Sequence, residues 1–215
     1  MIEATRREKR KKRMIIALVS IFIALVLIWI LVSVIENILV EKNANENNKP
    51  IAYNFYYADF EENIFEDEEY TELIRGEGLR YCDMHSNVTV SIDENTIDNY
   101  GEDVKFFWDF LQNIVNGDKD AYNAMFSKEY FKSNPAKEAF TMQKIYDSQI
   151  TKYSTEEIET TNGNYTKYIY VVEYRILKNN GTFRNDIGDG SRAQYITITN
   201  KSGEFLIDSI GYIRY

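Results

Sequence analysis

The chain has 215 residues and a formal net charge of −9. A surface this acidic repels phosphate backbones, so we expect no nucleic-acid partner. Cys82 is the only cysteine, which excludes an internal disulfide and leaves the hydrophobic core to hold the fold.

The first feature along the chain is a long apolar stretch, residues 14–35, which contains no charge, proline or glycine. As a helix it measures roughly 33 Å, enough to cross a hydrocarbon layer of about 30 Å. A buried core helix is the alternative, but a soluble helix of this length normally has a polar face. The stretch is also longer than the apolar region of a cleaved signal peptide, and no small-residue cleavage site follows. It therefore predicts a retained transmembrane helix.

The flanking charges predict its orientation. Residues 1–13 carry seven cations against two acids, so the chain's charge of −9 leaves −14 beyond residue 35. Positive flanks stay in the cytoplasm, and a basic tail beside a membrane suits anionic lipid. We expect a single-pass plasma-membrane protein with a cytoplasmic N-terminus and an extracytoplasmic C-terminal domain. Abundant Asn, Ile, Lys and Tyr point to a bacterium of low GC content.

Two segments separate this anchor from the main domain. Residues 36–50 are polar and Asn-rich, which is typical of a flexible linker. Residues 51–100 form an extension that is first aromatic and then, over 59–72, acidic. Calcium binding is one interpretation of the clustered acids, but they lack calcium-loop spacing, and a solvated helix face is favoured.

A β-hairpin is predicted within the extension, from strands at 79–83 and 87–92. His85, the only histidine, falls in its turn. We interpret it as an exposed polar residue rather than a general base, and a single histidine cannot build a multi-histidine zinc site.

Helical periodicity begins at residue 101. Residues 101–116 place apolar side chains at helical spacing around much of the circumference, and Trp108 is expected to be buried between helix and sheet. Gly117 suits the end of that helix, and Asp118 the N-cap of a second one through Phe126. Asn134 and Pro135 predict the start of a third helix, extending to Tyr146.

The rest of the sequence has the alternation and turn residues of antiparallel strands. Four are expected, at 149–160, 165–177, 192–199 and 204–214. Helices followed by strands predict an α+β fold, with about three helices packed on a curved four-stranded antiparallel sheet.

Residues 101–215 resemble the nuclear-transport-factor-2-like (cystatin-like) superfamily. The resemblance rests on an aromatic helix, a Gly-Asp junction and a second helix: Phe106, Phe107, Trp108, Asp109, Phe110, Leu111, Asn116, Gly117, Asp118, Ala121, Met125, Phe126 and Ser127. It implies a cone with a pocket. With the anchor, the layout looks like bitopic subunits of type IV secretion and conjugation systems, and equally like uncharacterised anchored envelope proteins of clostridia.

Two functions follow from this layout. The first is a non-catalytic scaffold that binds protein partners or self-associates. The second is a small-ligand binder or an isomerase- or dehydratase-like enzyme that uses the cone pocket. For the enzyme, the resemblance implies an acid or base among Asp109, Asp147, Tyr170 and Tyr174. Asp109 is better explained as an exposed helix carboxylate and the tyrosines as core or sheet residues, so the scaffold is preferred.

One loop offers a further ligand site, because it holds acids and arginines together: Arg184, Asp186, Asp189 and Arg192. Asp and Gly are also ordinary turn formers, so the loop needs no ligand. We assign no catalytic, cofactor-binding or metal-binding residue and expect no cofactor. The expected partners are the membrane and proteins, with a small molecule as the alternative.

Overall fold

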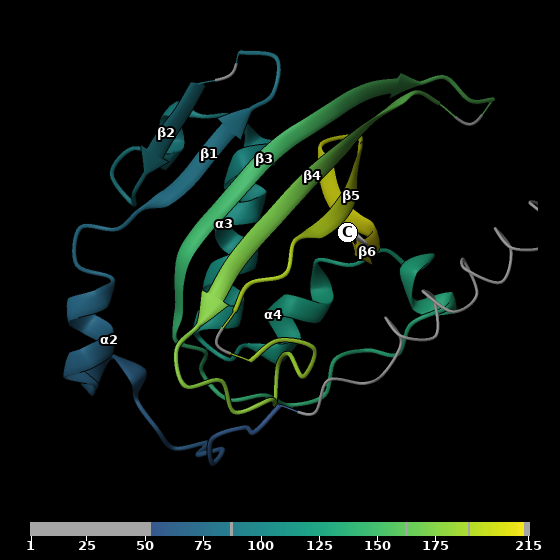
Figure 1. Cartoon of the computed structure of the whole chain (residues 1–215). Coiled ribbons are helices and arrows are strands. Elements are labelled where there is room, and N and C mark those ends of the chain that lie inside the picture. The colour runs from purple at the N-terminus through teal and green to yellow at the C-terminus, as the bar shows by residue number, and fades with distance from the viewer. Residues whose placement is uncertain (1–52, 87, 162, 189, 213–215) are drawn as a thin grey trace, which may run out of the picture. The chain divides into compact units, whose positions relative to one another are not determined.

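A computed structural model describes residues 53–86, 88–161, 163–188 and 190–212 (Figure 1). The predicted basic tail, transmembrane helix and linker lie outside these ranges. Within the described ranges, no helix is both long and apolar enough to cross a membrane. The α-helices are α2 (Glu68–Leu73), α3 (Glu102–Val115) and α4 (Lys119–Ala124), with short 3₁₀ turns at Ile64–Glu66, Ile97–Asn99 and Tyr130–Lys132.

Helix α3 is the central helix, and it matches the predicted helix at 101–116. Its buried face presents apolar side chains at helical spacing: Val104, Phe107, Phe110, Leu111, Ile114 and Val115. Gly117 follows at φ +66°, a left-handed conformation that glycine adopts without strain. The Asp118 side chain then accepts a hydrogen bond from Ala121 N and caps α4. Both predicted helix boundaries are therefore confirmed.

Six strands form one mixed sheet in the order β2-β1-β3-β4-β5-β6. Their bounds are β1 Leu79–Asp83, β2 Val88–Ile92, β3 Ile145–Ile158, β4 Tyr165–Ile176, β5 Gln194–Lys201 and β6 Glu204–Tyr212. Figure 1 shows β3 and β4 as long curved strands with α3 along one face of the sheet. The predicted hairpin at 79–92 is confirmed as β1 and β2.

The predicted four-stranded antiparallel sheet is wrong, although the α+β class is right. Strands β3 to β6 are antiparallel, but β1 pairs in parallel with β3, Arg80 opposite Gln149. Parallel neighbours need a long crossover, and here α3 and α4 supply it. The sequence did not predict that the hairpin joins this sheet, because α3 and α4 separate it from the later strands along the chain.

The predicted third helix, from Asn134 to Tyr146, is also wrong. Residues 135–144 form no regular secondary structure, and β3 begins at Ile145. Asn123 on α4 holds this segment through both of its amide atoms, which bond to the Lys137 backbone. Further along, Gln143 N donates to Val115 O at the end of α3. These tertiary contacts satisfy the backbone without a helix and override local propensity.

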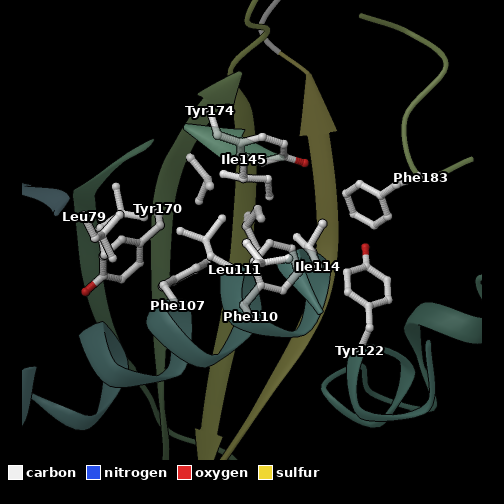
Figure 2. Packing of buried hydrophobic residues seen from close by; sticks show 14 of the residues in the cluster. Leu79, Phe107, Phe110, Leu111, Ile114, Tyr122, Ile145, Tyr170, Tyr174 and Phe183 are labelled. Atoms are coloured by element: carbon white, nitrogen blue, oxygen red, sulfur yellow. The ribbon is translucent and has the colours of Figure 1, made fainter. Parts of the chain in front are cut away.

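The core between α3 and the sheet is filled by aromatic and branched side chains (Figure 2). Phe107 lies with its ring centroid 4.4 Å from that of Tyr170, and both are fully buried. Beyond α3, Tyr122 and Phe183 meet edge to face at 5.4 Å. Trp108, expected to be buried, is only half-buried, because Phe107 and Phe110 occupy the face of α3 that meets the sheet.

Candidate interaction surface

Residues 53–67 lie across the ends of β3 and β4, and we call this segment the aromatic strap. The described residues include nine exposed large hydrophobic side chains. Five of them are in the strap: Phe55 (38% exposed), Tyr56 (55%), Tyr57 (91%), Phe60 (60%) and Phe65 (48%). Scattered exposed apolar residues are ordinary, but a concentration on one short segment is typical of an interaction site.

Backbone contacts fix the first half of the strap to the loop after β4. Tyr56 N donates a hydrogen bond of 3.0 Å to Asn179 O. Gly181 lies under the Phe55 ring, where a Cβ atom would come within 2.9 Å of the ring. Gly188 lies in the same way against Tyr53, with a corresponding distance of 2.7 Å. The absence of a side chain at these two glycines therefore allows the rings of Phe55 and Tyr53 to pack directly against the backbone.

Ion pairs with the buried Lys144 fix the second half. Lys144, whose side chain is 8% exposed, donates to Glu62 Oε1 and Asp67 Oδ2, both at 2.6 Å. The more exposed Lys178 adds a longer contact to Asp67 Oδ2 at 3.5 Å. The hydrogen bond from Lys144 lowers the pKa of Asp67 to about 2. The strap is thus held by its backbone and some of its acids, which leaves the rings of Tyr57 and Phe60 in solvent.

A hollow of about 210 Å³ lies between the strap and the sheet, lined by Tyr56, Tyr57, Glu62, Met142, Gln143, Lys144, Ile176, Leu177, Lys178 and Asn180. Gln143 is 1% exposed, and its Nε2 donates to Thr141 O at 2.9 Å. Its Oε1 has no hydrogen-bond partner among the described residues. The hollow is smaller than the roughly 300–1,000 Å³ of typical ligand pockets, and is better matched to a side chain of a partner.

A second charged cluster lies under the first turn of α3. Asp103 Oδ2 accepts a hydrogen bond from Tyr170 Oη at 2.6 Å and pairs with Lys152 Nζ at 2.5 Å. Burial, with the Asp103 charge, raises the pKa of Tyr170. For Lys152, burial lowers the pKa, but the hydrogen bond and charge of Asp103, together with the nearby Tyr81 and Asp83, outweigh it and the net shift is upward. The cluster joins α3 to β3 and β4, and its carboxylate suits a helix N-terminus.

The two carboxylates considered for catalysis occupy different positions. Asp109 is exposed on α3, beside a shallow hollow shared with Met125 and Phe205. Partial burial nevertheless raises its pKa above the usual value. Asp147, at φ +52° in a bulge of β3, pairs with Arg80 at 2.8 Å and with Arg175 at 3.4 Å. That carboxylate therefore ties β1, β3 and β4 together.

Tyr170 and Tyr174 are core residues, 0% and 1% exposed, as the sequence suggested. The arginines of the 184–192 loop do not form an open anion site, because both pair with Asp186. Arg184 contacts its carboxylate through Nε at 2.9 Å and Nη2 at 2.7 Å, and Arg192 Nη1 lies 3.4 Å away. Asp189 lies outside the described residues.

His85 is exposed in the hairpin turn, with Nδ1 3.4 Å from Asp83 Oδ1. Cys82 is a half-buried free thiol on β1. Within the described part of the chain, no group of three or more His, Cys, Asp or Glu side chains is placed to hold a metal ion.

Sequence reasoning did not single out Lys144, Lys152 or Asp103. Lysines and acids are usually solvated, so residue type alone does not mark a buried one. One usable signal is the position of Lys144 directly before Ile145, the buried first residue of β3. No family model matches this sequence, and no curated protein matches it.

Proposed function

We propose that this chain is a non-catalytic protein-interaction module, carried at a membrane surface by residues 14–35, and that the aromatic strap binds its protein partner. The observation that carries the proposal is the arrangement of the strap. Its backbone and two of its acids are anchored, while Tyr57 and Phe60 keep most of their surface in water. Because the backbone that carries these rings is already held in place, it loses little entropy on binding, which suits the rings as contact residues.

Charge indicates the kind of partner. The strap exposes Asp59, Glu61 and Glu66 beside its rings. A complementary surface has apolar pockets bordered by Lys or Arg. Anionic lipid headgroups would be repelled by the same carboxylates, so the charge favours a basic protein over the membrane itself.

The enzyme alternative has less support. The resemblance implies a cone with a pocket between α3 and the sheet. In the structure, Phe107, Phe110 and Tyr170 fill that space (Figure 2). The cavity beside Trp108 measures about 180 Å³, below the roughly 300 Å³ at which ligand pockets usually begin. Because this space is filled, we propose a similarity to the nuclear-transport-factor-2-like superfamily only in the packing of a long helix on a curved sheet, without the open pocket.

The proposal is tested by site-specific photocrosslinking of the full-length chain in its own cells. A photoreactive residue at position 57 is expected to capture one protein repeatedly. The matched control is position 153 on β3, since Tyr153 is also an exposed tyrosine, at 46%. Raised salt and the double change Glu61→Lys, Glu66→Lys should both reduce capture. Equal capture from both positions, or crosslinks to lipid alone, would contradict the proposal.

The enzyme alternative is tested separately with Asp109→Asn, which removes the exposed carboxylate and leaves the strap intact. Cellular function should be retained if the chain acts as a scaffold. Lost function with normal folding and normal capture at position 57 would favour the enzyme.

A further inference from the structure

The two outer edges of the sheet differ in how they are covered. At the β6 edge, Ser127 N donates to Ile207 O at 3.0 Å, and Ile207 N donates to Met125 O at 2.8 Å. The segment around Phe126 thus pairs with β6 and covers that edge. At the β2 edge, no described strand pairs with the outer side of Val88–Ile92, and no backbone hydrogen bond joins it to a described loop.

The β2 strand also lacks the features that normally protect an edge. Its sequence, Val-Thr-Val-Ser-Ile, contains no charge, proline or glycine. Val88 is 57% exposed, and Met84, in the turn between β1 and β2, is 52% exposed. Proteins usually blunt free edges with Lys, Pro or bulges, so an uncharged β-branched edge indicates a strand partner.

We propose that this partner is the β2 strand of a second copy of the chain, paired antiparallel about a two-fold axis at Val90. In that register Val90 faces its own counterpart, Val88 faces Ile92, and Thr89 faces Ser91. One face of the joined strands is then entirely apolar and the other entirely hydroxylic, in accord with the alternation of the sheet.

Charge supports a second copy despite the acidity of the chain. Of the acids that follow β2, Glu94 lies opposite the uncharged Ser86 of the other copy in this register. No carboxylate of one copy faces a carboxylate of the other across the strand. The symmetric pairing would join two six-stranded sheets into one, with no residue of the strap involved. The inference is therefore independent of the proposed function.

Disulfide trapping in the full-length chain tests the register. With Cys82→Ser removing the native thiol, Val90→Cys should form a disulfide-linked homodimer on mild oxidation, because position 90 meets itself. Ser209→Cys on β6, at the opposite edge, is the control and should remain monomeric. Val90→Cys that links no better than Ser209→Cys, or that links to a different protein, overturns the proposal.

Charge changes added to the Val90→Cys variant distinguish this register from random collisions between two chains. Thr89→Lys with Ser91→Lys places two like-charged pairs across the axis and should reduce the dimer yield severalfold. Thr89→Lys with Ser91→Glu places opposite charges face to face and should preserve the yield. Both variants carry Thr89→Lys at an exposed site, so a folding defect from that change would affect them equally. Equal yields in the two variants would overturn the proposed pairing.

Discussion

The aromatic rings beneath α3 and those of the aromatic strap belong to the same residue types but have opposite surroundings. Phe107 and Tyr170 are fully buried, whereas Tyr57 and Phe60 are 91% and 60% exposed. The first pair packs ring against ring, and the strap is attached mainly by its backbone and by Lys144. Stability therefore depends on the first set, and the second set is free to bind.

The sharpest way to break this comparison is Phe107→Ala. Truncating a fully buried Phe should cost about 3–5 kcal/mol, much of the roughly 5–15 kcal/mol that stabilises a domain. Urea unfolding measures the loss. The neighbouring change Trp108→Ala is the matched control and should cost roughly 2 kcal/mol, because part of the Trp108 ring already contacts water. Equal costs would contradict the assignment of Phe107 to the core.

The next largest effect is expected from Asp103→Ala. The change leaves the Lys152 ammonium and the Tyr170 hydroxyl without their shared partner in a buried site. Losing one side of a buried ion pair should cost about 3 kcal/mol. Adding Lys152→Met should recover part of that cost, which a double-mutant cycle would show as a coupling between the two positions. Strictly additive effects would argue against the pair.

A smaller effect should come from Lys144→Met, which releases the strap. Asp67 has a folded pKa of about 2, below its ordinary 3.8, so the interaction stabilises the fold above pH 3.8 and is lost as pH falls toward 2. Unfolding free energies of the wild type should drop by roughly 1 kcal/mol more through that window than those of Lys144→Met, because the Tyr70 backbone hydrogen bond and Lys178 supply the rest of the pKa shift and are kept in the variant. Lys178→Met, which alters a more exposed lysine, should retain most of the wild-type pH dependence. Parallel pH profiles for wild type and Lys144→Met would contradict this role.

The smallest effect on stability is expected from Tyr57→Ser combined with Phe60→Ser. Both rings lie mostly in solvent, so the unfolding free energy should change by no more than about 0.5 kcal/mol. Capture of the partner should nevertheless fall strongly, as measured by crosslinking from a neighbouring strap position. A large loss of stability would mean that these rings are structural.

The regular elements were the most predictable part of the fold. The stripe of α3, the Asp118 cap and the alternation of β4 are local signals, and each led to the right element. The third helix was mispredicted because Asn123 and Val115 bond to the backbone of residues 135–144 outside a helix. Such contacts between distant residues leave no periodic pattern in the sequence. Parallel pairing of β1 with β3 was missed for the same reason.

Functional features were less predictable. The acidic and aromatic composition of the strap was visible in the sequence, but its division into anchored acids and exposed rings was not. That division depends on Lys144, which looks in the sequence like any solvated lysine. The opposite error occurred in the loop at Arg184. The sequence suggested that its charged residues could bind a ligand, but Arg184 and Arg192 both pair with Asp186 instead.

The parallel pairing of β1 with β3 also has a consequence for how the chain folds. The β1–β2 hairpin is local and can close within about 1–10 μs, but β1 cannot pair with β3 until residues through Lys152 have been made. At about 5–20 residues per second, the ribosome needs several seconds to supply them. During that interval the hairpin has two open edges instead of one. Arg80 and Asp83, the charged residues of β1, then act as gatekeepers that protect the nascent hairpin from premature association.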